Sequence, residues 1–230
     1  MNKRWNDYFS NIQNKYNLKM NKIKPIAILL DGKNLTKSLE CNLITENKNS
    51  FNDIFEQTIK YFSEKLGCMA ISGVDEVSFI IKDSKKLEEF LAIKKYRAQD
   101  IVSIFSQQFY NLFNKKYNKA PVYWHCKCLN IPKGKIKSYI EFRSVTIYQS
   151  KLTYFLKRKQ IRDAGMIPLA EQEKMCNELP GYEEIKEFAR GNMYVNGRYV
   201  NLNAFLNDQI IEMPEIERRE TREFLDLNDF

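Results

Sequence analysis

The sequence contains a single histidine, His125, and this scarcity excludes several kinds of catalytic and metal site. No Ser/His/Asp arrangement is evident, and no second pair of Cys or His residues lies at the spacing of a zinc site. The segment Cys126-Lys127-Cys128 alternates in character, so we interpret it as a strand that projects both thiols to one face. We interpret His125 as a residue of the same strand rather than as a general base.

Long apolar segments are also missing. No run approaches the roughly 20 residues that a membrane span needs, and the opening MNKRWNDYF is too polar for a signal peptide. The five cysteines are an odd number in a chain without an export signal, so we expect reduced thiols. These absences predict a cytoplasmic protein with no membrane partner.

What is present is a globular, basic composition. The 230 residues are 43% hydrophobic and 13% aromatic, which is enough for a full core. The formal net charge is +8, although the tail from Glu212 is acidic. A basic body favours a polyanionic partner such as nucleic acid, and a Lys-rich solvated surface is the alternative.

Hydrophobic periodicity predicts the order β-α-β-β-α-β in the first part of the chain. We expect strands at 26–30, 68–72, 77–81 and 121–131, and helices at 51–66 and 86–117. This order is the split βαβ, or ferredoxin-like, arrangement. It predicts a four-stranded antiparallel sheet with the first and third strands side by side at its centre.

Beyond Pro132 the pattern becomes helical. We expect helices at 137–161 and 183–190, and Asn196-Gly197 predicts a hairpin between 193–195 and 198–200. The expected fold class is therefore α/β. Residues 1–132 would form the ferredoxin-like core with a basic N-terminal segment, and 133–230 a helical C-terminal half with a small hairpin and an acidic tail.

Carboxylates lie at the ends of the two central strands. Asp31 follows the first strand, and Asp75-Glu76 precedes the third. In an antiparallel pair these positions fall at the same end of the sheet, where Asp31 and Asp75 could share hard divalent cations. Taken alone, Asp-Gly after a strand is most often only a turn.

The two carboxylate segments resemble the motifs of the tRNA-His guanylyltransferase family, the reverse (3′-to-5′) polymerases. The first segment reads Asp31-Gly32-Lys33-Asn34, and the second reads Val74-Asp75-Glu76-Val77-Ser78-Phe79. The resemblance extends over about residues 24–160. It continues at Arg97-Ala98, Gln108-Phe109, Tyr139, Arg143 and Leu152.

The resemblance implies a palm-type catalytic fold with two magnesium ions. Asp31 and Asp75 would be the catalytic residues and would hold the metals together with the Gly32 carbonyl, while Glu76 would be structural or support them. ATP or GTP would be the substrate. The residues implied in nucleotide binding are Lys33, Asn34 and Arg97, and those implied in RNA phosphate binding are Arg143 and Lys151. For Arg143 and Lys151, a solvated helix face is the alternative.

The implied activity is magnesium-dependent nucleotide addition to the 5′ end of tRNA-like RNA by a homo-oligomer, which in that family is a tetramer. Asp100 stands where the family has a lysine, and Tyr148–Lys151 stand where it has His-Ile-Asn-Asn. These departures concern substrate identity more than metal chemistry. Two alternatives stay open: a nucleotidyl cyclase or small-oligonucleotide synthase on the same fold, and a catalytically idle RNA-binding protein.

Overall fold

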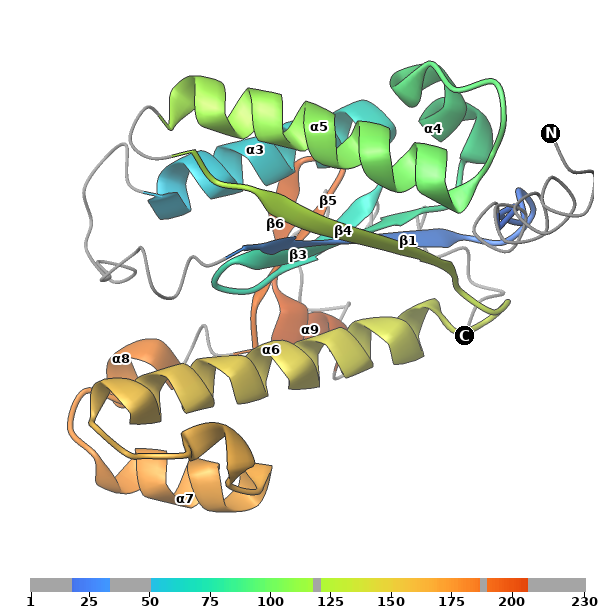
Figure 1. Cartoon of the computed structure of the whole chain (residues 1–230). Coiled ribbons are helices and arrows are strands. Elements are labelled where there is room, and N and C mark those ends of the chain that lie inside the picture. Colours follow the sequence, from blue (N-terminus) through green and yellow to red (C-terminus); the bar gives the residue numbers. More distant parts are fainter. Residues whose placement is uncertain (1–17, 34–50, 118–120, 187–189, 207–230) are drawn as a thin grey trace, which may run out of the picture.

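The computed structural model describes residues 18–33, 51–117, 121–186 and 190–206, which form one six-stranded sheet with helices on both faces (Figure 1). The strand order is β4-β1-β3-β2-β5-β6, and every neighbouring pair is antiparallel. The strands are β1 (Ile26–Gly32), β2 (Met69–Ser72), β3 (Glu76–Ile81), β4 (Trp124–Asn130), β5 (Asn192–Val195) and β6 (Arg198–Val200). The predicted α/β class and the central β1–β3 pair are confirmed.

The C-terminal hairpin is confirmed, and it adds two strands to the four that the sequence predicts for the sheet. β5 pairs with β2, with Met69 opposite Val195. The predicted boundary at residue 132 stays a prediction, although strands from both sides of it share one sheet. The basic segment before residue 18 and the acidic tail after residue 206 lie outside the described residues.

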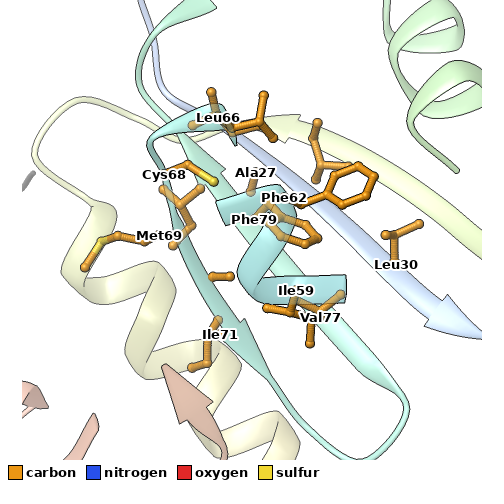
Figure 2. Packing of buried hydrophobic residues seen from close by; sticks show 14 of the residues in the cluster. Ala27, Leu30, Ile59, Phe62, Leu66, Cys68, Met69, Ile71, Val77 and Phe79 are labelled. Atoms are coloured by element: carbon orange, nitrogen blue, oxygen red, sulfur yellow. The ribbon is translucent and has the colours of Figure 1, made fainter. Parts of the chain in front are cut away.

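Three helices cover one face of the sheet: α3 (Phe51–Leu66), α4 (Ser84–Leu91) and α5 (Ala98–Lys116) (Figure 1). The core between them and the sheet is aromatic. The ring of Phe62 on α3 lies 5.9 Å from that of Phe79 on β3 and 5.1 Å from that of Phe105 on α5. Figure 2 shows Phe62 and Phe79 together with the aliphatic residues around them. This layer holds β1 and β3 in place from one side.

The prediction of one continuous helix over 86–117 is wrong, because the structure has two helices separated by residues 92–97. Ala92 adopts a left-handed conformation with φ of 52°, and its N–H group bonds to the carbonyls of Glu88 and Glu89. The main chain after it pairs with the N-terminal segment. Met20 N–H donates to the Tyr96 carbonyl, and Ala98 N–H donates to the Leu18 carbonyl, both at 2.9 Å.

The fourth strand begins at Trp124 rather than at residue 121. The side chain of Asn114 explains the late start, because it bonds to both main-chain groups of Val122, at 2.8 Å to the N–H and 3.0 Å to the carbonyl. Val122 is therefore tied to α5 instead of to a neighbouring strand.

The other face of the sheet carries α6 (Ile136–Arg158), which continues past the sheet into a small helical unit (Figure 1). The helices of this unit are η1 (Ala164–Met166), α7 (Leu169–Glu178) and α8 (Glu183–Lys186), and α9 (Leu202–Leu206) follows the hairpin. Buried residues form a second core here: Leu152, Phe155, Leu156, Ala164, Cys176 and Tyr182. None of the described helices is long and apolar enough to cross a membrane.

We predict that Gly191→Ala destabilises the join between the hairpin and β2. Gly191 has φ of 102°, and an added Cβ would lie 2.6 Å from the Ser72 carbonyl oxygen. We expect a loss of about 2–3 kcal/mol in the free energy of unfolding, measured in urea. Gly134→Ala is the control, because its φ is also positive but nothing lies within 4 Å of the new atom. That variant should lose only about 1 kcal/mol, and equal losses in the two variants would contradict the steric explanation.

Candidate active site

Asp31 and Asp75 lie at the same end of the two central strands. The register of β1 and β3 puts Asp31 directly opposite Glu76, the residue after Asp75. Gly32 N–H donates to the Asp75 carbonyl at 2.8 Å, so one main-chain bond joins the two carboxylate segments. The sequence-based expectation that these two acids share one end of the sheet agrees with this geometry.

The Asp75 carboxyl group is held in an unfavourable electrostatic environment. Burial, and after it the nearby negative charges of Asp31 and Glu76, together raise its pKa from 3.8 to about 6. Asp31 itself is exposed. Above about pH 6, two like charges therefore face each other at a partly buried position, which is a cost to folding.

The chemistry of these groups fits a hard divalent cation. Two carboxylates and the Gly32 carbonyl are oxygen donors of the kind that magnesium binds, and a cation would relieve the repulsion between Asp31 and Asp75. Glu76 Oε1 is buried and has no hydrogen-bond partner, so a further oxygen remains available beside them. Within the described ranges, no three His, Cys, Asp or Glu side chains gather as a metal site would.

Glu76 is paired with a buried arginine of α6, the helix that covers the face of the sheet carrying Asp31 and Glu76. Arg143 Nη2 on α6 donates to Glu76 Oε2 at 2.6 Å, and both side chains are largely buried. The guanidinium balances the Glu76 charge and turns one of its oxygens toward α6. The RNA phosphate role of Arg143 stays a prediction, and in this structure its partner is Glu76.

Two further contacts fix α6 beneath the carboxylates. Tyr139, one helical turn before Arg143, donates from its hydroxyl to Ser78 Oγ at 3.3 Å. One turn after Arg143, Ile147 packs so closely that a Cβ added at Gly73 would lie 3.1 Å from its Cγ1 atom. Gly73 begins the turn that carries Asp75, since its N–H donates to the Glu76 carbonyl at 2.8 Å. Helix α6 therefore supports this turn from below.

The residues predicted to bind nucleotide lie in different places. Lys33 is exposed in the turn after β1, and its N–H donates to the Tyr123 carbonyl at 2.8 Å. Asn34 lies outside the described residues. Arg97 precedes α5, and the carbonyl of its neighbour Ala98 accepts a bond from Cys128 Sγ at 3.8 Å.

This contact puts the backbone of Arg97 on the α5 side of the sheet, away from the carboxylates. Cys128 is opposite Ile28 in the β1–β4 register. Ile28 is three residues, or about 10 Å of strand, before Asp31, and its side chain lies on the other face. The fold therefore places Lys33 close to the carboxylates, but not the backbone of Arg97. The nucleotide-binding role of Arg97 stays a prediction.

Lys151 is half-buried on α6, and burial lowers the pKa of its ammonium group to about 8. A phosphate contact would raise that pKa again by stabilising the ammonium, and this role stays a prediction. Nearby, Tyr148 donates from its hydroxyl to Glu173 Oε1 at 2.7 Å and lies 3.0 Å from the Tyr182 hydroxyl. The residue that replaces the histidine of the resembled family is thus bonded within the helical unit.

Sequence reasoning did not anticipate the position of His125. The β1–β4 register puts it directly opposite Asp31, on the other side from Glu76. The alternation of β4 indicates which residues share a face, but only the register shows that this face is the one that carries Asp31.

We predict that Asp75→Asn stabilises the metal-free protein near pH 7.5 and about half as much near pH 5. The native pKa is raised to about 6, so the folded protein binds more protons between about pH 4 and 6 and loses stability as the pH rises through that interval. The penalty is fully present above this interval, and asparagine removes it. Urea unfolding with chelator at both pH values measures the difference.

The control for this experiment is Glu141→Gln, which removes an exposed carboxylate from α6. It should change stability equally little at both pH values. A loss of stability in Asp75→Asn near pH 7.5 would mean that the Asp75 carboxylate supports the fold rather than straining it.

We predict that Arg143→Met destabilises the protein by about 3–5 kcal/mol, because it leaves the buried Glu76 carboxylate unpaired beside two other acids. Arg143→Met combined with Glu76→Gln should recover most of that loss, since no uncompensated charge remains. Chemical unfolding of wild type, both single variants and the double variant gives the coupling energy. Additive effects of the two substitutions would disprove the coupling.

Comparisons with solved structures place the fold. A bacterial tRNA(His) guanylyltransferase-like protein in complex with GTP is 15% identical, with a TM-score of 0.64 over 99% of this chain and 99% of that chain. A bacterial protein of the same description in complex with ATP is 15% identical, with a TM-score of 0.59 over 83% of this chain and 84% of that chain.

The tRNA(His) guanylyltransferase of Saccharomyces cerevisiae is also similar, with 20% identity and a TM-score of 0.52 over 83% of this chain and 93% of that chain. No family model matches the sequence, and no curated protein matches it. The fold of this chain is therefore the palm fold of tRNA(His) guanylyltransferase-like proteins, as the two carboxylate motifs predict.

Proposed function

We propose that this chain is a magnesium-dependent nucleotidyltransferase that adds nucleotides to the 5′ end of tRNA-like RNA. The observation that supports this most directly is the meeting of Asp31 and Asp75 at one end of the central β1–β3 pair. The fold in which they meet is shared with proteins solved in complex with ATP and with GTP. Either nucleotide is therefore a candidate substrate.

Asp31, Asp75 and the Gly32 carbonyl would hold two magnesium ions. When bound, the metal would neutralise phosphate charge and lower the pKa of an attacking hydroxyl group. Lys33 is exposed in the turn directly after these residues, where its ammonium group can bind a triphosphate. Arg143 keeps Glu76 paired on the α6 side, so the Glu76 charge does not add fully to those of Asp31 and Asp75.

RNA is the acceptor that the charge of the chain favours over a second small nucleotide. The net charge is +8, and a polyanion gains more from such a surface than a mononucleotide does. Tyr148 is engaged with Glu173 and Tyr182 rather than available to read an RNA identity element. We therefore expect several 5′-truncated tRNAs to be used, with addition guided by the opposite strand.

The deciding experiment incubates the protein with magnesium, labelled nucleotides and 5′-truncated tRNAs that differ in anticodon. We expect the label at the RNA 5′ end for several of these tRNAs. Asp31→Asn should lower the rate at least about 100-fold while the fold is retained, because removal of a metal-binding carboxylate removes charge stabilisation in the transition state. Exclusive use of full-length tRNA-His would disprove the relaxed specificity. Dinucleotides formed without RNA would favour a cyclase or oligonucleotide synthase instead.

A melting experiment separates an enzyme from an idle RNA-binding protein. ATP or GTP with magnesium should raise the melting temperature of the wild type, and chelator should abolish the rise, because only the native state binds. Asp31→Asn should show no such rise. A shift of equal size with and without magnesium would indicate a non-specific basic patch.

A further inference from the structure

Antiparallel pairing aligns side chains in rows across β3, β1 and β4 on the face that carries Asp31. The row at the carboxylate end consists of Glu76, Asp31 and His125. The next two rows consist of Ser78, Leu29 and Lys127, and of Ile80, Ala27 and Leu129. Neighbouring residues in a row are about 5 Å apart, and successive rows lie about 7 Å apart along the strands.

Within these rows, side chains become more exposed from β3 through β1 to β4. Ser78 is fully buried, Leu29 is half-buried and Lys127 is exposed. The third row changes from 0% exposed at Ile80 to 46% at Leu129.

The contacts of α6 explain this gradient, because Arg143 and Tyr139 reach Glu76 and Ser78 of β3. Helix α6 therefore covers β3 and leaves the β4 side of this face open. We call the exposed part of it the open face, formed by Asp31, His125, Lys127 and Leu129.

The open face continues the candidate active site outward. β4 is the edge strand of the described sheet, so a chain that reaches Asp31 from that side meets no further strand. Lys127 supplies an ammonium group, His125 supplies a ring N–H group, and Asp31 is the sole acid among the six side chains that β1 and β4 place here. Beside the cation, Leu129 presents an apolar surface.

We infer that the open face binds the 5′-terminal strand of the RNA substrate. Lys127 would contact a backbone phosphate, and His125 would donate a hydrogen bond to the RNA residue nearest Asp31. A cationic side chain beside an apolar one, as at Lys127 and Leu129, suits a single strand, because its phosphates need positive charge and its bases and sugars pack on apolar groups. This inference rests on the proposed function, and it assigns the approach path of the RNA rather than the site of the nucleotide.

The test compares Lys127→Ala with Lys115→Ala by titrating a fluorescent 5′-truncated tRNA with each protein at several salt concentrations. Lys115 is exposed on α5, in the helix layer on the opposite face of the sheet, so both variants lose one positive charge. Lys127→Ala should weaken binding about five-fold and reduce the slope of log Kd against log salt by about 0.7–0.9. Lys115→Ala should leave both unchanged. Lys127→Arg should retain the wild-type slope, because it keeps the charge.

His125→Ala adds a second measurement on the same face. We expect a weaker affinity for RNA and an unchanged rise in melting temperature with ATP or GTP, because the histidine contacts the RNA and not the triphosphate. Unchanged RNA binding in both Lys127→Ala and His125→Ala would overturn the inference. Equal effects of Lys127→Ala and Lys115→Ala would also overturn it, since they would indicate diffuse charge.

The nucleotide experiment separates this inference from the proposed function. A wild-type protein whose melting temperature rises with ATP or GTP and magnesium, but which binds no RNA, would overturn the RNA path and still support the two-carboxylate site. A wild type that adds nucleotides to RNA, with Lys127→Ala and His125→Ala both unchanged in RNA affinity, would overturn only the path.

Discussion

The register of β1 against β3 is the constraint on which the rest of the site depends. Side chains alternate between the two faces of a sheet, so a slip of one residue would move Asp31 into the aromatic layer under α3 and α5. The pairing of Ile28 with Phe79 and of Leu30 with Val77 prevents that slip, because all four side chains are fully buried on the face covered by α3 and α5. The hydrophobic core thus determines which carboxylates meet on the other face.

Helix α6 fixes the carboxylate end of the β1–β3 pair relative to the rest of the chain. Through Tyr139, Arg143 and Ile147 it contacts Ser78, Glu76 and Gly73 near the carboxylate end. A hydroxyl pair, an ion pair and a tight apolar contact depend on different distances and chemistry, so together they define one position of the helix. The raised pKa of Asp75, mainly due to burial, is a consequence of this close packing around its turn.

The sequence predicts the sheet centre well, because apolar runs, turn residues and the order of elements all indicate the same arrangement. It also predicts that Asp31 and Asp75 share one end, which follows from topology alone. The break in the predicted long helix was missed because no glycine or proline marks it; Ala92 adopts the left-handed conformation there, and residues 18–20 pair with the loop.

The partners of two site residues depend on tertiary structure and could not be read from local pattern. Arg143 is a charged residue on a helix, and only the packing of α6 shows that it is buried against Glu76. His125 and Lys127 share a strand face in any register, but their relation to Asp31 depends on which strand β4 joins and at which offset.

The second core, around Leu152 and Tyr182, is attached to the sheet layer chiefly through the long helix α6. Arg143 and Leu152 are nine residues apart, about 13 Å along the helix axis. Mutations that repack the second core therefore change surfaces at the far end of the helix while the three contacts beneath the carboxylates stay in place. If the proposed function holds, such an architecture would let what the protein recognises vary separately from its chemistry. Tyr148, which stands where the resembled family has a histidine, bonds within this second unit.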